Sequence, residues 1–434
     1  MKYNLIIMLG LFTIQTVMAQ DTKTLTLKEA VDLSVKNSKL LKLNEAKIQE
    51  ATTAIKEAEE KQLPDANTSV SYMYLPVKPV IDLKSGSSSN GSPSVNQAML
   101  ASVAIALPVY SAGKLKYGIE SAKYLEQAVK LDADNDRSGV ILNTINACIN
   151  LFKAHQAITL VKENLQQSQQ RVKDFTSLEK NGLMARNDLL KAELQSSNIE
   201  LTLLDAESNY KLACVNMNIM LGLPEQTILV PDRNGLALPA SIKTIDEYEQ
   251  AALQNRKDIS AIAERKKAAD LNIKYVATEK YPSISLTGGY IAADVPKFLS
   301  VYNAVNIGVG VKYNIASIWK TKTKIQQATI KVQQLQSSQD ILNDNIRLQI
   351  NQMYQVYVVS VKKIEVLEKS IIQATENYRI TKNKYDNSLA TTTELLDADV
   401  ALLQSRLSVT NAKADSFIAY NRLLQAAGLL TEKL

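Results

Sequence analysis

Histidine and cysteine are nearly missing from this chain. Its 434 residues include one histidine, His155, and two cysteines, Cys148 and Cys214. These are too few to supply the histidine and cysteine ligands of a zinc site, so the sequence predicts no metal site of that kind. No glycine-rich phosphate loop follows a predicted strand either. We therefore assign no catalytic, metal-binding or cofactor-binding residue and interpret the protein as non-enzymatic.

The sequence also lacks a large excess of one charge sign and has few long apolar runs. The 50 lysines and arginines exceed the 44 aspartates and glutamates only slightly, and the net charge of +6 is spread along the chain, so no nucleic-acid-binding face is expected. Hydrophobic residues make up 46% of the chain, which excludes intrinsic disorder. Beyond residue 20, no apolar run is long enough for a transmembrane helix. If the mature chain enters a membrane, it must do so as β-strands.

Residues 1–19 have the pattern of a secretory signal peptide. Lys2 precedes the apolar segment 5–12, and residues 17–19 place small or medium-sized side chains before Gln20, where a signal peptidase would cut. A membrane anchor is the alternative, but about 14 apolar-rich residues fall short of the ~20 that span a bilayer. The first cysteine lies far downstream, so the mature N-terminus lacks the acceptor for a lipid. We expect export without lipidation.

The ten prolines fall into three clusters and leave two long proline-free tracts. Residues 109–223 and 297–434 are rich in alanine, leucine, lysine, glutamine and glutamate, which favour helices. Apolar residues recur at steps of four and three over residues 141–152, which is the spacing of a coiled-coil seam. Long packed helices are therefore expected in both tracts, the first from Lys114 to about Glu179.

The chain contains two copies of one sequence unit. Residues 187–192 align with 393–398 at a shift of 206 positions, and the same shift places Gly222 on Gly428. Nearer the start of each copy, the shift is 218. The first copy therefore has about twelve extra residues, which we assign to the serine- and glycine-rich loop 85–93.

Each copy is expected to contain a helix, a β-hairpin, a very long helix, a tip turn and a further helix. This order describes an internally duplicated α+β protein. The expected boundaries are a signal peptide at 1–19; a first repeat at 20–223, with its hairpin at about 64–110 and its tip turn at about 181–187; a linker at 224–247; and a second repeat at 248–434, with its hairpin at about 282–314 and its tip turn at about 387–393.

The predicted strands alternate in polarity. In segment 305–311, large apolar residues alternate with asparagine and glycine, so one face is apolar and the other small or polar. A soluble β-sandwich is the alternative, but glycine, alanine and serine fill a core poorly, whereas they suit a water-filled lumen. Strands of about 9 to 11 residues fit a tilted outer-membrane barrel. We interpret Gly288 and Gly289, inside a strand pattern, as a kink or bulge in the barrel wall.

Four strands per chain are too few to close a membrane barrel, because the smallest single-chain barrels have about eight. Three chains with four strands each would supply twelve, with room for a channel. The long helices would then continue the wall as a tube. Trp319 and Tyr110, at the expected strand-to-helix junctions, should lie at the membrane interface.

Several motifs in a fixed order resemble the TolC family of outer-membrane channel proteins. They are residues 107–113 at the entry to the first long helix, the tip motifs 181–192 and 385–398, and the closing glycines Gly222 and Gly428. Two features depart from the family pattern. Ser388 stands where the family usually has glycine, and residues 314–319 are a degenerate copy of 108–113.

The resemblance implies an α+β membrane protein that assembles as a homotrimer. Two β-hairpins per chain would contribute to a twelve-stranded β-barrel in the lipid of the outer membrane, and the long helices would form a periplasmic coiled-coil barrel. Such a tunnel docks on a periplasmic adaptor protein and an inner-membrane transporter, and it serves efflux or type I secretion. An exported coiled-coil scaffold or adhesin is the alternative, but it does not account for the paired, alternating hairpins.

The two tip turns are expected to bind the adaptor, because they join antiparallel helices at the far end of the tube. Small or apolar residues in the turns admit close packing of partner helices. The predicted contact residues are Gly182, Leu183, Ala185, Ser388, Leu389 and Ala390. Alternatively these are only turn residues, an interpretation that is strongest for Gly182.

The resemblance also implies a periplasmic gate, held nearly shut by hydrogen bonds and ion pairs and lined by rings of acidic side chains. When the motifs are matched, Glu394 and Asp397 occupy the positions of the acidic rings. Tyr385 and Asp188 occupy the positions of a latch. The family's latch arginine has no equivalent, since Ala390 occupies its position. Glu394 and Asp397 are three apart and so share one helix face. Alternatively, Glu394 completes a capping box and Asp397 only favours the helix start.

Cys148 and Cys214 are expected at similar heights on two antiparallel helices. A disulfide is one interpretation, since the periplasm is oxidising. Packing as small buried residues is the favoured interpretation, because closely packed helices seldom provide the Cα separation that a disulfide needs.

Overall fold

The computed structural model describes residues 22–77, 95–232, 239, 241–296 and 298–430. The predicted signal peptide, 1–19, and the loop 85–93 both lie outside these residues. The chain divides into two compact units, and both sequence repeats contribute to each of them. The first unit comprises Met1–Lys39, Arg137–Glu249 and Gln349–Leu434, and the second comprises Leu40–Asp136 and Gln250–Leu348.

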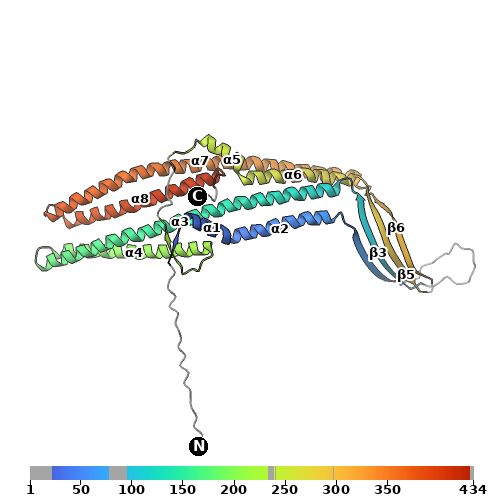
Figure 1. Cartoon of the computed structure of the whole chain (residues 1–434), viewed down its shortest axis with the longest axis horizontal. Helices are drawn as coiled ribbons and strands as arrows, with labels where there is room; N and C mark the ends of the chain where they lie inside the picture. Colours follow the sequence, from blue (N-terminus) through green and yellow to red (C-terminus); the bar gives the residue numbers. More distant parts are fainter. Residues whose placement is uncertain (1–21, 78–94, 233–238, 240, 297, 431–434) are drawn as a thin grey trace, which may run out of the picture. The chain divides into compact units, whose positions relative to one another are not determined.

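Each repeat folds as two short helices, a β-hairpin and two long helices (Figure 1). The first repeat contains β1 (Thr22–Leu25), α1 (Leu27–Asn37), α2 (Lys39–Glu60), β2 (Asp65–Tyr74), β3 (Gln97–Tyr110), α3 (Lys114–Lys180) and α4 (Arg186–Leu221). The second contains β4 (Ile228–Pro231), α5 (Ile245–Asn255), α6 (Lys257–Ala277), a 3₁₀ turn (Thr278–Lys280), β5 (Ser283–Val295), β6 (Leu299–Lys312), α7 (Ser317–Asp386) and α8 (Thr392–Ala426). Within the described residues, no helix combines the length and apolar character needed to cross a bilayer.

The helix expected before each hairpin is broken into two. In both copies the break follows an asparagine, Asn37 or Asn255, a residue type with low helix propensity. The next residue, Ser38 or Arg256, leaves the helical region with ψ of 121° or 127°. The side-chain amide of Asn37 donates a hydrogen bond of 2.6 Å to the carbonyl oxygen of Leu221. This bond connects the end of α1 to the end of α4.

The second unit contains a four-stranded antiparallel sheet in the order β2-β3-β5-β6. Its register places Val103 beside Tyr290, and Tyr290 beside Val305, so the large apolar residues of neighbouring strands share one face, here called the apolar face. Small and polar residues such as Gly289 and Asn306 share the opposite face. The predicted alternation is therefore confirmed.

The predicted kink or bulge at Gly288 and Gly289 is wrong. Both glycines pair regularly with β3 and β6, and the register shifts lie at 108–110 and 291–293 instead. Gly289 marks a close approach of two backbones, because a Cβ added there would lie only 2.4 Å from the carbonyl oxygen of Val103. Glycine is required at position 289 because the neighbouring backbone leaves no room for a Cβ. The strand itself is regular there.

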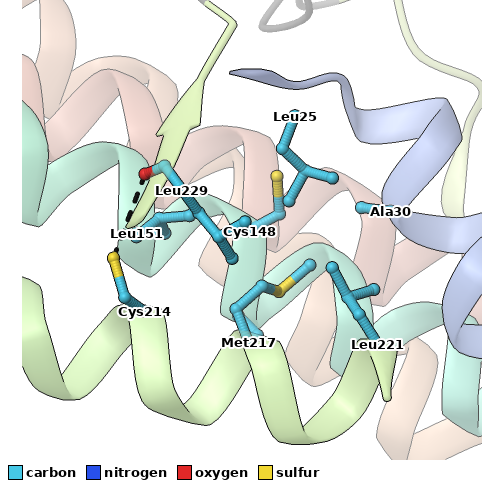
Figure 2. Packing of buried hydrophobic residues seen from close by; sticks show 9 residues of the cluster. Leu25, Ala30, Cys148, Leu151, Cys214, Met217, Leu221 and Leu229 are labelled. Carbon is cyan, nitrogen blue, oxygen red and sulfur yellow. Dashed lines mark hydrogen bonds between the residues drawn. The ribbon is translucent and has the colours of Figure 1, made fainter. Parts of the chain in front are cut away.

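A short parallel strand pair, which the sequence analysis did not predict, completes a core in the first unit. Thr22 of β1 lies opposite Ile228 of β4. Leu25 and Leu229 from these strands are almost fully buried against residues of α1, α3 and α4, among them Met217 (Figure 2). The segment predicted as a linker thus contributes a strand to the core.

Cys148 and Cys214 both lie in this cluster as free thiols (Figure 2). The Sγ of Cys214 lies 3.9 Å from the carbonyl oxygen of Leu229. Burial raises the pKa of the Cys148 thiol to about 11, so that thiol is protonated at neutral pH. Both cysteines pack as small buried residues, as predicted.

Candidate functional site

Both long helix pairs of the first unit end in a short tip turn. Between α3 and α4, Gly182 has φ of +71°, and the N–H of Leu183 donates to the carbonyl oxygen of Leu178 at 2.9 Å. This is the hydrogen bond of a Schellman helix end, where glycine adopts the left-handed conformation without strain. The turn leaves Leu183 74% exposed.

The second tip turn repeats this geometry with a serine in place of the glycine. Ser388, equivalent to Gly182 under the repeat shift, has φ of +62°. The N–H of Leu389 donates to the carbonyl oxygen of Lys384 at 2.7 Å, and Leu389 is 77% exposed. The two turns therefore present a leucine in the same way, although only one has the favoured turn residue.

The six predicted adaptor-contact residues all lie in or beside these turns. Ala390 is half-buried, and the others are exposed: Gly182, Leu183, Ala185, Ser388 and Leu389. The turns are shorter than predicted, because α4 already begins at Arg186 and α8 at Thr392. The five exposed residues are accessible to a partner, and their role in adaptor binding stays a prediction.

Replacing Ser388 by glycine should raise stability, because the left-handed conformation costs a residue with a Cβ about 1 kcal/mol. The reciprocal variant, Gly182→Ser, should lower it by a similar amount, since a Cβ there meets open space and only backbone strain is added. Thermal unfolding midpoints of the two purified variants measure both effects. A Ser388→Gly midpoint at or below that of the unmodified protein would contradict the strain argument.

An apolar cluster beneath the turns joins the two helix pairs. Phe175, Leu189, Ala192 and Leu395 are buried in it and come from α3, α4 and α8. Tyr385 of α7 stacks on Phe175 with the ring centroids 5.7 Å apart. All four long helices contribute to this cluster, so a common core positions both tip turns of one chain.

Glu394 is engaged in capping the start of α8. Its Oε2 accepts a hydrogen bond from the N–H of Thr391 at 2.6 Å, while the N–H of Glu394 donates to the Thr391 hydroxyl oxygen at 3.3 Å. The hydrogen bond from the Thr391 N–H, and after it one of 3.0 Å from the Thr391 hydroxyl to the same Oε2, hold the pKa of Glu394 below its ordinary value. The capping box predicted as the alternative is present, and it keeps the carboxylate ionised at the tip.

The other two acidic residues of the predicted gate differ in their surroundings. Asp397 is exposed and lies three residues beyond Glu394 on α8. Asp188, in the first turn of α4, forms an ion pair of 3.3 Å with Lys191. Lys191 also donates to the hydroxyl of Thr393 at 3.2 Å, which connects α4 to the start of α8. Asp397 therefore remains the better candidate for a charge that faces a channel.

Tyr385 lies within reach of the charge of Asp188, its predicted latch partner. Burial is the main cause that raises the pKa of Tyr385; a hydrogen bond with Thr392 opposes the rise, and the Asp188 carboxylate adds to it. The phenol is therefore protonated and able to donate. Tyr385 forms a hydrogen bond with Thr392, however, and Asp188 an ion pair with Lys191, so the latch stays a prediction.

A buried ion pair that was not predicted from the sequence lies beside the tip. The Nη1 of Arg171, on α3, lies 3.0 Å from the Oδ2 of Asp399, on α8, and these side chains are only 10% and 3% exposed. Asn164 donates to the other carboxylate oxygen at 3.3 Å, and Arg171 also donates to the hydroxyl of Tyr378 at 3.4 Å. Ala390 occupies the position of the latch arginine that the family resemblance implies. A different arginine, Arg171 on α3, contacts α8.

The sequence and the fold of this chain are similar to those of known proteins. Residues 30–223 and 249–429 match the family model described as outer membrane efflux protein. The outer membrane efflux protein BepC of Brucella suis is 23% identical over 307 residues, which cover 68% of this chain and 65% of BepC. The outer membrane protein TolC of Vibrio cholerae is 22% identical over 314 residues, which cover 68% of this chain and 69% of TolC. The chain thus spans about two thirds of the length of these curated relatives.

A solved structure extends the similarity to almost the whole chain. The outer membrane protein VceC of Vibrio cholerae has a TM-score of 0.74 and 17% identity, over 93% of this chain and 96% of that chain. This match shows the predicted TolC-like fold, with long helices, strands that form part of a barrel, and duplicated halves. Because the family model matches most of the chain, the protein belongs to the outer membrane efflux protein family, whose members are non-enzymatic channels.

Proposed function

We propose that the chain forms a homotrimeric outer-membrane channel, the exit duct of an efflux pump. The four-stranded sheet is the observation that carries this proposal. Its edge strands, β2 and β6, each have one neighbour among the described strands. Three such sheets joined edge to edge make a barrel of twelve strands, with the apolar face towards lipid and the small, polar face towards a water-filled lumen.

The exposed tip turns support docking of a partner protein. In this arrangement, a periplasmic adaptor contacts Leu183 and Leu389, and an inner-membrane transporter delivers the substrate to the helical tunnel. The name of the relative BepC refers to efflux, which favours efflux over type I secretion. The chain reaches the periplasm by its signal peptide, and its mature N-terminus carries no lipid.

Purification from outer membranes in detergent tests the assembly directly. Light scattering should give about three times the mass of the mature chain. The same preparation should produce stepwise conductance in planar bilayers. A monomer that stays in solution without detergent, or a trimer that conducts no ions, would contradict the proposal.

Replacing Leu183 by arginine should weaken adaptor binding about tenfold, because loss of one exposed apolar anchor at an interface commonly costs about 1.4 kcal/mol or more. Folding should be unaffected, since Leu183 is exposed in the turn. Leu183→Met is the matched control and should bind normally. Site-specific cross-linking to the adaptor, together with drug susceptibility of the cells, measures the effect. Normal cross-linking by Leu183→Arg would exclude this turn from the interface.

Replacing Asp397 by alanine should reduce the cation preference of the channel and weaken block by multivalent cations about a hundredfold. Three carboxylates are lost from one ring, each worth ~1 kcal/mol at contact distance in water, and about 1.4 kcal/mol corresponds to a factor of ten. Asp205→Ala removes an exposed carboxylate from α4, far along the helix from the tip turn, and is the control. Planar-bilayer recording with graded multivalent cation measures both variants. Equal block of the Asp397→Ala and unmodified channels would remove Asp397 from the constriction.

A further inference from the structure

All four connections between the sheet and the helices lie at one end of the sheet. The register places the start of β2 near the end of β3, the end of β3 beside the start of β5, and Ser283 at the start of β5 opposite Lys312 at the end of β6. The other end of the sheet is marked by the pairs Tyr74 with Gln97 and Val295 with Leu299. Under the proposed function, this junction end is where the barrel leaves the membrane on the periplasmic side.

The second junction combines exposed apolar side chains with lysines. Residues 312–324 contain four lysines and no acidic residue. Ile315, Ile318 and Trp319 are 64%, 57% and 62% exposed there. Large exposed apolar groups beside clustered positive charge are typical of a surface that enters the headgroup region of a bilayer.

The lysines of this junction differ in their partners. Lys324 is engaged in an ion pair of 2.6 Å with Glu279. Among the described residues, no carboxylate pairs with Lys312, Lys320 or Lys322, and all three are exposed. Their ammonium groups are therefore available to an anionic ligand outside the chain.

We propose that Lys312, Lys320 and Lys322, with Trp319 as the adjoining aromatic anchor, bind anionic phospholipid headgroups of the periplasmic leaflet. The proposal rests on the proposed membrane insertion of the sheet. Charge complementarity selects an anionic over a zwitterionic lipid, because each lysine adds attraction only where the headgroup carries net negative charge. The aromatic ring sets the depth at which the lysines meet the headgroups.

Trp319 is the only tryptophan of the chain and therefore reports on this site alone. The full mature protein is reconstituted in vesicles of equal parts phosphatidylglycerol and phosphatidylcholine. The acyl chains of one lipid are brominated in the first preparation, and those of the other lipid in the second. Bromine quenches tryptophan fluorescence on contact. The quenching ratio, which is quenching by brominated phosphatidylglycerol divided by quenching by brominated phosphatidylcholine, therefore measures local enrichment of one lipid. We expect brominated phosphatidylglycerol to quench at least about twofold more than brominated phosphatidylcholine, with a smaller ratio at high salt.

Three variants locate the effect. Replacing Lys312, Lys320 and Lys322 together by glutamine should bring the ratio to one, whereas arginine at the same positions should preserve it. Lys331→Gln, an exposed lysine further along α7, is the matched control and should leave the ratio unchanged.

The outcomes separate this inference from the proposed function. Equal quenching by both lipids, or a ratio that survives the triple glutamine variant, would overturn the headgroup site while leaving the channel intact. Absence of quenching by either lipid would overturn the headgroup site and also contradict the membrane placement of the sheet.

Discussion

Replacing Arg171 by methionine should destabilise the tip of the helical region by about 3–5 kcal/mol, because it leaves the carboxylate of Asp399 buried without its cation. Asp399 is 3% exposed, and Asn164 alone then donates to it. Asp399→Leu should be similarly destabilising, since it leaves the guanidinium of Arg171 buried without its carboxylate. The double variant should recover most of the loss, because two apolar side chains replace two charges in the same space.

An exposed ion pair of the same unit provides the control. Lys153 and Asp415 also connect α3 to α8, at 2.8 Å, but their side chains are 26% and 50% exposed. Lys153→Met should therefore cost less than about 1 kcal/mol. Urea unfolding followed by the circular dichroism of the helices measures all four variants. An Arg171→Met variant no less stable than Lys153→Met would show that the buried pair does not hold α3 and α8 together.

Replacing Gly289 by alanine should prevent correct assembly of the sheet. The added Cβ would lie 2.4 Å from the carbonyl oxygen of Val103 and 3.1 Å from the Oδ1 of Asn306, so strand β5 must move away from β3. Overpacking of this kind costs about 1–3 kcal/mol or more, and here the opposing atom is backbone, which cannot rotate away. The yield of heat-resistant oligomer in outer-membrane fractions measures the loss.

The neighbouring glycine offers a control in the same strand. A Cβ added at Gly288 would lie 3.7 Å from the carbonyl oxygen of Asn306, an ordinary contact. Gly288→Ala should therefore assemble nearly normally. Equal assembly of the two alanine variants would show that the close approach at Gly289 is relieved without cost.

The long helices and hairpins could be predicted because their signals are local and repeated. Missing prolines mark α3 and α7, and period-two alternation marks β3 and β6. The repeat shift also aligns Ser388 with Gly182. The two residues share a left-handed turn conformation, which the preferences of serine alone would not predict. By contrast, β1 and β4 have four residues each and pair far apart along the chain, so no periodicity exists to reveal them.

The candidate site was predictable only in part, for the same reason. The capping box at Glu394 is a short motif that can be read directly from neighbouring residues. The pairing of Arg171 with Asp399 joins distant helices, and the repeat shift aligns these residues with Asn377 and Glu193, which do not repeat the charge pair. A charge that is buried by tertiary packing has the same sequence signature as one on a solvated helix face.

The pairing of β1 with β4 sets an order of events during folding. Thr22 is synthesised early, but Ile228, its partner 206 positions later, is synthesised only after the whole first repeat. Such non-local pairing forms late, because the intervening loop must close first. The first repeat cut at residue 223 would lack β4, leaving the cluster around Leu25 and Met217 uncovered. A fragment that folds independently must therefore extend through Pro231.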